Sequence, residues 1–426
     1  MRIVHLNSHA SGGGAGRAMY RLHQGLTCLG HSSRILAQFR ALGEPGVFAI
    51  AEVGEGRGFS LACLIDALGR RMEARLGIPY ARYRSTQYIA QSDFIEQADV
   101  VNLHNLHGRY FNYHMLPAFS ARKPVVWTLH DMWALTGHCA YAYDCQRWRT
   151  GCFDCPLLKE PGRQIVEPRP ARIDRTRQVW RAKQRLYRST RLHIVTPSQW
   201  LCGLVQESIL SDSASIQCIP YGLDLTTFKP LDRPMARQAL GIPLEAKTIL
   251  FAAQSVAHKR KGFQYLLDAL DRVRDAESVV LLTMGAKSAA SSKLDRFKQR
   301  HLGRLSDERL MSLVYSAADL FVLPSLADNQ PLVLIEAMAC GTPMVCFQVG
   351  GLPEMVRHME TGYLAHYKDV QDLTRGIRTL LDDDDLRTRM GRRCRQIAKA
   401  EYSLQLQAKR YAELYAHAIA SRESDS

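Results

Sequence analysis

The sequence contains no uninterrupted apolar run of about 18 residues, the shortest length with which a helix spans a membrane. Its first residues, Met-Arg-Ile-Val-His-Leu-Asn, have neither the long apolar stretch nor the small-residue cleavage site of a secretory signal peptide. No pattern of a nucleic-acid-binding module is present either. These absences favour a folded cytoplasmic protein.

Acidic residues are scarce relative to basic ones. The chain has 41 Asp and Glu against 56 Lys and Arg, which gives a formal net charge of +15. Such an excess of positive charge suits a protein that binds nucleic acid, an anionic membrane surface or phosphorylated substrates. Without a nucleic-acid module, we expect an enzyme that acts on lipid-linked pyrophosphate acceptors at the inner face of the cell membrane.

The length of 426 residues exceeds that of a single ordinary core and predicts two domains. Buried strands are expected at 3–6, 98–103 and 124–129, each followed by a loop and a helix. A Pro- and Gly-rich segment at 219–230 predicts the domain boundary, and strand–helix alternation restarts at 248–253. The fold class is therefore α/β.

The segment 328–343, Asp-Asn-Gln-Pro-Leu-Val-Leu-Ile-Glu-Ala-Met-Ala-Cys-Gly-Thr-Pro, follows a predicted buried strand at 320–325. It predicts a loop carrying Asp328 and a helix that begins near Pro331 and carries Glu336. Ligands of open α/β sheets bind at the carboxyl ends of the strands. Two carboxylates there could bind sugar or ribose hydroxyls, or Asp328 could cap the helix while Glu336 faces solvent.

A cluster of cations, Lys259, Arg260 and Lys261, precedes Gly262 after the predicted strand at 248–253. Cations at a strand's carboxyl end just before a helix suit a diphosphate, although exposed loop lysines are also common.

The first predicted strand leads into a glycine-rich loop that includes Gly13 and Gly14. Glycines let backbone amides approach an anion, so a phosphate cradle is expected. Arg17 stands where the third glycine of G-x-G-x-x-G belongs, which argues against a dinucleotide site.

Three histidines, His104, His107 and His130, follow predicted strands on the same edge of the first sheet. One histidine alone is more often structural than functional, but three predict a polar acceptor pocket.

Four cysteines lie within a loop expected at 136–160: Cys139, Cys145, Cys152 and Cys155. Four thiolates are enough to surround one structural Zn²⁺, although their spacing is not that of a zinc finger. Reduced thiols and disulfides are the alternatives. The odd total of eleven cysteines favours a reducing compartment.

The pattern at 324–343, with Leu-His-Asp at 129–131 and Lys-Gly at 261–262, resembles the retaining glycosyltransferases of family 4. The cysteine loop is similar to that of a subgroup associated with exopolysaccharide and surface-glycan assembly. The resemblance implies the GT-B fold, two Rossmann-like domains that face each other across a cleft. The implied domains are 1–218 for the acceptor and 219–400 for the nucleotide sugar, with a helix at 401–426 that crosses back.

The resemblance also implies a nucleoside-diphosphate sugar as donor, a glycan or polyprenyl-linked saccharide as acceptor, and no cofactor for catalysis. It implies catalytic roles for His130, Lys261 and Asp328. The implied donor site comprises Gly13, Gly14, Ser255, Arg260, Lys261, Gly303, Asp328, Asn329, Leu332 and Glu336.

Two positions depart from the family pattern. Asp328 stands where Glu is usual, and Ser255 lies in a region that usually has an Arg, for which Arg260 is the candidate replacement. Two other functions are compatible with these patterns: a sugar-nucleotide epimerase or other phosphosugar enzyme of the same fold, and a zinc-containing nucleic-acid-binding protein.

Overall fold

The computed structural model describes residues 1–39, 44–53, 57–78, 83–108, 110–159, 173–256, 258–273, 279–286 and 298–424. For residues 57, 70, 71, 74, 75 and 159 it describes the backbone alone, and residue 160 of the expected cysteine loop lies outside it. The chain forms two compact units: Met1–Pro220 with Gln405–Ser426, and Tyr221–Leu404. The sequence placed these divisions after residue 218 and at residue 401.

The first unit is built on a parallel sheet that has seven strands in its described residues, in the order β3-β2-β1-β4-β5-β6-β7. Several strands consist of short segments in which every residue is buried, such as Val100–Leu103. Such segments are typical of parallel strands that helices cover on both faces. The strands are β1(Arg2–His9), β2(Ser32–Phe39), β3(Val47–Ala49), β4(Val100–Leu103), β5(Val125–Thr128), β6(Leu192–Thr196) and β7(Ser215–Cys218).

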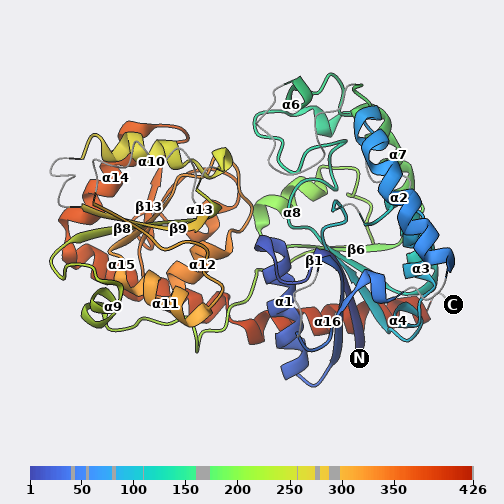
Figure 1. Cartoon of the computed structure of the whole chain (residues 1–426), viewed down its shortest axis with the longest axis horizontal. Coiled ribbons are helices and arrows are strands. Elements are labelled where there is room, and N and C mark those ends of the chain that lie inside the picture. Colours follow the sequence, from blue (N-terminus) through green and yellow to red (C-terminus); the bar gives the residue numbers. More distant parts are fainter. Residues whose placement is uncertain are drawn as a thin grey trace. The chain divides into compact units, whose positions relative to one another are not determined.

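Helices and loop segments cover this sheet (Figure 1). The α-helices are α1(Gly13–Cys28), α2(Arg57–Leu76), α3(Ser85–Ala90), α4(Asp93–Glu96), α5(Leu116–Arg122), α6(Pro156–Lys159), α7(Thr176–Arg188), α8(Gln199–Gln206) and α16(Leu404–Glu423). Short 3-10 helices are η1(Ile50–Glu52), η2(Tyr113–Met115) and η3(Arg147–Arg149).

The C-terminal helix α16 belongs to the first unit although it comes last in the chain (Figure 1). The Tyr415 hydroxyl accepts a hydrogen bond from the Asn102 side chain at 2.6 Å, and the hydroxyls of Tyr411 and Thr128 lie 3.0 Å apart. Both tyrosines are fully buried against β4 and β5. This helix therefore completes the core of the first unit.

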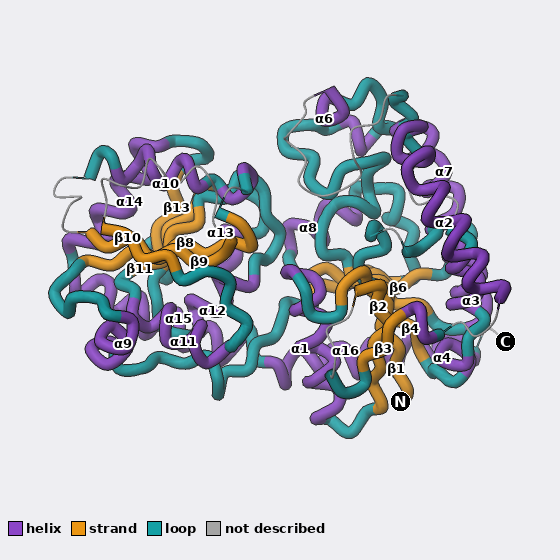
Figure 2. The backbone as a smooth tube through the Cα atoms, in the orientation of Figure 1, coloured by secondary structure: helices purple, strands orange, loops and turns teal. Residues whose placement is uncertain are grey.

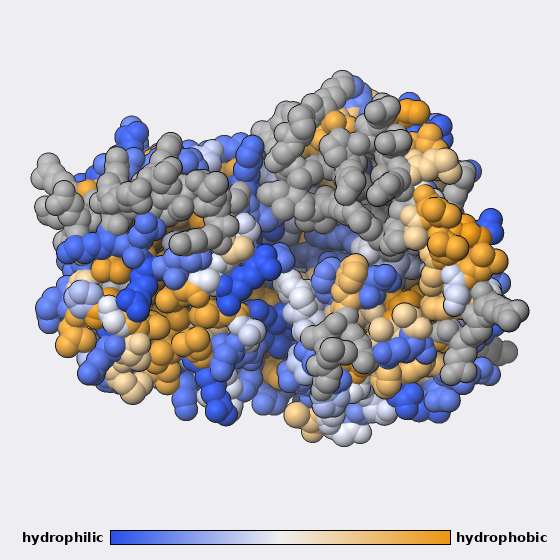
Figure 3. Space-filling model, viewed as in Figure 1, coloured by the Kyte–Doolittle hydropathy of each residue, from blue (hydrophilic) through white to orange (hydrophobic). Residues whose placement is uncertain are grey.

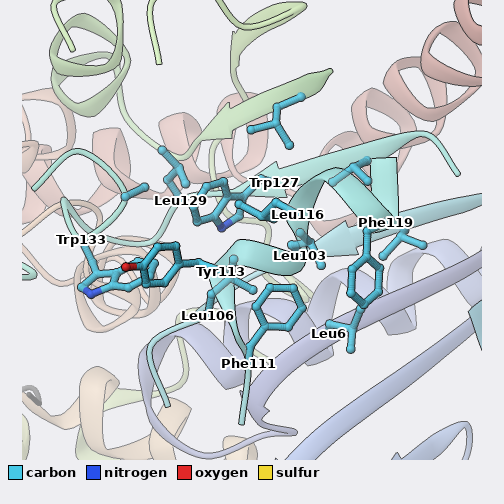
Figure 4. Packing of buried hydrophobic residues seen from close by; sticks show 14 of the residues in the cluster. Leu6, Leu103, Leu106, Phe111, Tyr113, Leu116, Phe119, Trp127, Leu129 and Trp133 are labelled. Atoms are coloured by element: carbon cyan, nitrogen blue, oxygen red, sulfur yellow. The ribbon is translucent and has the colours of Figure 1, made fainter. Parts of the chain in front are cut away.

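A large core cluster of the first unit reaches from the sheet into the loops that follow β4 and β5 (Figure 4). Figure 4 shows Tyr113 beside Trp133, and their ring centres are 6.2 Å apart. Trp127 lies deeper in the same cluster, on β5 itself. The loops at this edge of the sheet are thus fixed by buried aromatic side chains.

The second unit has a parallel sheet of six described strands in the order β10-β9-β8-β11-β12-β13. The strands are β8(Lys247–Ser255), β9(Val279–Ala286), β10(Lys298–His301), β11(Leu320–Leu323), β12(Met344–Phe347) and β13(Gly362–Ala365). The chain runs outward from β8 through β9 to β10, then returns to β11 on the other side of β8. This reversal makes the β8–β11 edge the topological switch point, where open sheets bind ligands.

Helices lie on both faces of this second sheet, as the purple segments of Figure 2 show. They are α9(Arg233–Leu240), α10(Phe263–Leu270), α11(Glu308–Ala317), α12(Leu332–Ala339), α13(Leu352–Met355), α14(Val370–Asp382) and α15(Asp384–Glu401), with the 3-10 helix η4(Lys259–Lys261). The expected α/β class with two parallel-sheet domains is confirmed. Among the described residues, no helix combines the length and apolarity needed to cross a bilayer.

Candidate active site

Two loops meet at the switch point of the second unit, one after β8 and one after β11. Gly262 ends η4 with φ +71°, and a Cβ there would lie 1.8 Å from the carbonyl oxygen of Pro324. The amide of Leu326 donates a hydrogen bond to the carbonyl of Arg260 at 2.7 Å. Glycine is therefore required at position 262 so that the two loops can approach each other.

This approach brings two cations of the first loop onto Asp328 of the second. Lys261 Nζ lies 2.5 Å from Oδ2 of Asp328, and an Arg260 guanidinium nitrogen lies 3.0 Å from Oδ1. Ser325 Oγ donates to Oδ2 at 3.0 Å, and Arg260 also donates to the carbonyl of Ala327 at 2.6 Å. The Asp328 side chain is only 7% exposed. The structure thus places a buried carboxylate between two cations.

The electrostatics follow from this geometry. Burial raises the pKa of Asp328, but Lys261 and Arg260 outweigh burial and hold that pKa at about 2. Burial, followed by the charges of Arg260 and Lys261, lowers the pKa of His258 to about 4. At neutral pH the site therefore contains an ionised Asp328, two cations and an uncharged His258, an arrangement that can exchange one anion for another.

Glu336 lies in α12, whose first turn follows Pro331. Its side chain is fully buried, and the Tyr315 hydroxyl donates to Oε2 at 2.8 Å. The backbone of Asp328 is held close to a second glycine: a Cβ at Gly350 would lie 2.0 Å from the Asp328 carbonyl oxygen. Two carboxylates are thus fixed on either side of the start of α12, one by cations and the other by a tyrosine.

The other residues expected to bind the donor lie around these loops. Ser255 ends β8, and Asn329 and Leu332 are buried beside Asp328 in the chain. Gly303 follows β10, and its carbonyl accepts a hydrogen bond from the Gly285 amide at the end of β9 at 2.7 Å. All of them lie at the carboxyl edge of the second sheet or in the turn that follows it.

In the first unit, the glycine segment differs from its prediction. Helix α1 already begins at Gly13, so Gly13 and Gly14 form its first turn instead of a separate loop. Both are exposed, and Gly13 has φ +70°. Gly16, which the sequence did not single out, packs closely: its Cβ would lie 3.0 Å from the His9 carbonyl oxygen. Exposed amides at this helix start can still approach an anion.

A chain of three buried histidines crosses the first sheet. His130 Nε2 lies 2.9 Å from His104 Nδ1, and His104 Nε2 lies 3.1 Å from His5 Nδ1. Burial lowers the pKa of His130 to about 4 and that of His5 to about 3. These rings are neutral at physiological pH, and a neutral imidazole both donates and accepts one hydrogen bond. The predicted pocket did not include His5, because this residue lies within the apolar segment 3–6. A polar histidine inside a predicted buried strand was the signal that could have identified it.

The third predicted histidine forms a different contact. His107 Nε2 lies 2.9 Å from Asp131 Oδ2, and Asp131 Oδ1 accepts the Trp133 amide at 2.8 Å. Burial raises the pKa of Asp131, but His107 and the hydrogen bonds lower it further than burial raises it. His107 therefore positions the loop after His130 and does not join the histidine chain.

The four predicted cysteines surround one small cavity, which is also lined by His138 and Trp148. All four are reduced. Within the described residues, no three His, Cys, Asp or Glu side chains stand at metal-binding spacing. Burial raises the pKa of Cys152 to about 11 and raises that of Cys155.

Lys183 of α7 lies beneath this loop and is completely buried, whereas the arginines of the same helix are exposed. Its Nζ donates to the carbonyls of Trp133 and Thr136 at 2.6 and 2.9 Å and lies 3.4 Å from the centre of the Trp133 ring. Burial lowers the pKa of Lys183 to about 7. Its helical spacing with the buried residues Val179 and Tyr187 was the available signal.

Comparison with known proteins gives two family matches. Residues 12–227 match the model described as Glycosyltransferase Family 4, and residues 232–397 match the model described as Glycosyl transferases group 1. The two matches correspond closely to the two units of the structure.

Among individual proteins, the chain is 29% identical over 259 residues to the putative colanic acid biosynthesis glycosyl transferase WcaC of Escherichia coli, covering 58% of this chain and 59% of that one. It is 33% identical over 251 residues to D-inositol 3-phosphate glycosyltransferase of Corynebacterium jeikeium, covering 55% of this chain and 59% of that protein. The chain thus spans about three fifths of the length of these curated relatives.

Solved structures share the fold at low identity. Anabaena Alr3699/HepE in complex with UDP aligns with a TM-score of 0.66 at 16% identity, over 98% of this chain and 100% of that one. WaaG, a glycosyltransferase involved in lipopolysaccharide biosynthesis, aligns with a TM-score of 0.64 at 17% identity, over 96% and 98% of the two chains. Both similarities support the GT-B fold.

Proposed function

The chain belongs to glycosyltransferase family 4, and from this premise we propose that it transfers a sugar from a nucleoside-diphosphate sugar to a glycan or lipid-linked saccharide, with retention at the anomeric carbon. The observation that carries the proposal is the contact of Asp328 with Lys261 and Arg260 at the switch point of the second unit. Relatives named for colanic acid and lipopolysaccharide biosynthesis support an acceptor in polysaccharide assembly.

The two cations are the proposed diphosphate site. When the donor binds, its diphosphate takes the place of the Asp328 carboxylate beside Lys261 and Arg260. As the bond from the anomeric carbon to the phosphate oxygen breaks, negative charge builds up on that oxygen, and fixed cations stabilise it. Backbone amides at the start of α12 add to this stabilisation. No metal ion is required for this step.

The two carboxylates are the proposed sugar and ribose ligands. Released from the cations, Asp328 accepts hydrogen bonds from donor sugar hydroxyls. Glu336 accepts hydrogen bonds from the ribose hydroxyls, and the Tyr315 hydroxyl, 2.8 Å away, fixes its orientation. Carboxylates accept several hydrogen bonds, which suits hydroxyl-rich ligands.

Retention requires the acceptor oxygen to attack from the face that the diphosphate leaves. The bond from the acceptor oxygen to the anomeric carbon forms as the bond to phosphate breaks, and the acceptor proton passes to the departing phosphate oxygen. His130 is uncharged at neutral pH because burial lowers its pKa to about 4. We therefore assign it a hydrogen-bonding role in positioning the sugar and acceptor.

The surface of the first unit supports contact with an anionic membrane. The outward face of α2 carries four exposed apolar side chains, 57–72% exposed: Leu61, Leu64, Leu68 and Met72. The orange area over α2 in Figure 3 includes this face. The inward face buries Phe59 and Ala62 together with the acids Asp66 and Glu73. The exposed apolar side chains therefore leave a surface for a partner.

Helix α7 is a neighbour of α2 and presents basic side chains. Tyr113 is near both helices. Burial and the charge of Glu73 in α2 raise the pKa of its hydroxyl, and Lys183 Nζ in α7 lies 6.0 Å from the centre of its ring. Exposed arginines recur along α7 at helical spacing: Arg177, Arg181, Arg185 and Arg188. An apolar stripe beside a basic one suits the surface of an anionic bilayer, at the cytoplasmic face of the membrane.

The donor experiment is a thermal-shift panel of UDP-, GDP- and ADP-sugars, followed by a transfer assay with and without saccharide acceptors. Binding to the folded state raises the midpoint of unfolding, so one nucleotide series should stand out. Acceptor-dependent transfer is the expected result. Conversion of the donor sugar without an acceptor would instead indicate an epimerase.

Membrane contact is tested by sedimentation with phosphatidylglycerol and phosphatidylcholine vesicles. We expect binding to the anionic vesicles only, reduced by Leu64→Glu with Leu68→Glu. Leu244→Glu is the control, because Leu244 of the second unit is also well exposed, at 54%. Equal vesicle binding by the α2 variant and the control would contradict a role for α2.

A further inference from the structure

The cysteine loop between β5 and α7 has no part in the proposed transfer step, yet its four cysteines face a common, partly open cavity. The side chains of Cys139, Cys145, Cys152 and Cys155 line a cavity of about 20 Å³. This volume accommodates one water-sized occupant. Four sulfur atoms around one ion-sized space are the ligand set of a closed tetrahedral site.

The backbone around the cysteines is arranged to support thiolates. The Gly137 amide donates to Cys152 Sγ at 3.2 Å, and the amides of Leu157 and Leu158 interact with the Cys155 sulfur. Backbone N–H groups stabilise the charged form of an acceptor. The sulfur atoms of the last two cysteines, Cys152 and Cys155, therefore each face backbone donors.

The turn between the last two cysteines is strained. Cys152 has φ +46° and Asp154 has φ +45°, a region that residues other than glycine seldom adopt. Such backbone conformations persist only where surrounding contacts hold them in place. A common ligand bound by both Cys152 and Cys155 would hold this turn.

Lys183 supplies the matching charge. Its ammonium is completely buried beneath the loop and is close enough to Cys139 and Cys152 for their charges to interact. Four thiolates around Zn²⁺ carry a net charge of −2. A buried cation next to such a centre offsets part of that charge, in addition to the negative charge of Asp131 that also acts on the ammonium.

We propose that Cys139, Cys145, Cys152 and Cys155 bind one structural Zn²⁺. Binding would draw the four sulfur atoms from their present spacing to about 2.3 Å from the ion and release their protons. Four thiolates fill the coordination sphere, so this metal takes no part in sugar transfer. Its role is to hold the loop that carries Trp133 and, next to it, Asp131 and His130.

The test measures metal directly and does not depend on the proposed activity. The full chain is purified under reducing conditions without a metal-affinity step, and its zinc content is measured by mass spectrometry of the metal. Zinc released by stepwise addition of a mercurial thiol reagent is followed with a colorimetric indicator. We expect about one zinc per chain, released as the protected thiols react.

Variants locate the site. Cys145→Ser and Cys155→Ser should each lower the zinc content at least several-fold. Cys28→Ser and Cys63→Ser are the matched controls, because both cysteines are exposed and lie outside the loop. They should retain the wild-type zinc content.

Three results would overturn the proposal, and the first two need only the wild-type chain. One is a zinc content well below one per chain together with titration of all eleven thiols in denaturant, which would mean that the four cysteines are reduced and bind no metal. Another is a thiol count reduced by two or four, which means disulfides. The third is equal zinc content in the loop variants and the controls, which means that the metal is bound elsewhere.

Discussion

Replacing Asp328 with Asn separates the two roles assigned to this residue. The substitution keeps the size of the side chain but removes its negative charge. In the wild type, the carboxylate oxygens lie 2.5 Å from Lys261 and 3.0 Å from Arg260. Holding the pKa of Asp328 at about 2 instead of 3.8 corresponds to about 2 kcal/mol in favour of the folded state. Breaking a buried pair costs about 3–5 kcal/mol. We therefore expect a loss of about 3 kcal/mol in the free energy of unfolding.

For a unit the size of residues 221–404, this loss corresponds to a drop of about 6–12 °C in Tm. Differential scanning calorimetry without ligand measures it. The pKa of Asp328 is depressed, so its contribution is fully present above pH 3.8 and is lost as the pH falls toward about 2. The difference between wild type and variant should therefore be constant near neutral pH and shrink only below about pH 4.

Ligand binding should change in the opposite direction. In the wild type a diphosphate must displace Asp328 from its cations, whereas in the variant the cations are available. We expect the Kd of the matching nucleoside diphosphate to fall by about tenfold, or about 1.4 kcal/mol, in isothermal titration calorimetry. The nucleotide sugar should gain less because its hydroxyls lose a carboxylate, and the transfer rate should fall by about a hundredfold or more.

A matched control is Asp319→Asn. Asp319 precedes β11, at the opposite end of that strand from Asp328, and is likewise buried between two cations, Arg233 and Arg237, at 3.1 and 2.8 Å. Its loss should lower Tm by a similar amount and leave nucleotide affinity unchanged. Diphosphate binding by Asp328→Asn that is no tighter than binding by this control would refute the exchange of carboxylate for diphosphate.

The remaining predictions concern the partners of these groups. Tyr315→Phe removes a hydrogen bond to the buried Glu336 carboxylate and should cost about 1–3 kcal/mol of stability and raise the donor KM more than it lowers kcat, as steady-state kinetics would reveal. Gly262→Ala places a methyl group against a main-chain carbonyl of the neighbouring loop and should abolish nucleotide binding in calorimetry, whereas Gly69→Ala, with open space around it, should not. Lys183→Met should shorten the half-time of zinc loss to a chelator several-fold if its charge balances the thiolates, and an unchanged half-time would remove that role.

Much of the second unit could be predicted from local patterns. The buried strand Leu320–Leu323, the loop with Asp328 and the helix carrying Glu336 are all visible in consecutive residues, because strand and helix periodicities are local properties. The contact between Lys261 and Asp328 is not local, since 67 positions separate them. Sequence patterns placed both residues at strand ends, and only the sheet order brings those ends together.

In the first unit, helix α7 shows how composition and periodicity can disagree. Its sequence is strongly basic, a composition typical of a solvated helix. The structure divides it, with Arg181 and Arg185 exposed and Lys183 buried, because helical spacing puts position 183 on the face of Val179. A buried lysine contradicts composition-based expectation and depends on partners contributed by the distant residue Trp133.

The histidine chain limits how the acceptor can be activated. His5, His104 and His130 are all buried, and burial is the largest cause that lowers the pKa of each; for His130 it outweighs the opposing charge of Asp131. A histidine with a pKa of about 4 is a weak base at neutral pH, so proton removal by His130 would be slow. The acceptor proton must then go to a stronger base formed during the reaction, and the departing diphosphate is one. A rate that stays flat between about pH 6 and 8 in the transfer assay would agree with this assignment, whereas a rising limb that disappears in His130→Gln would identify His130 as the base.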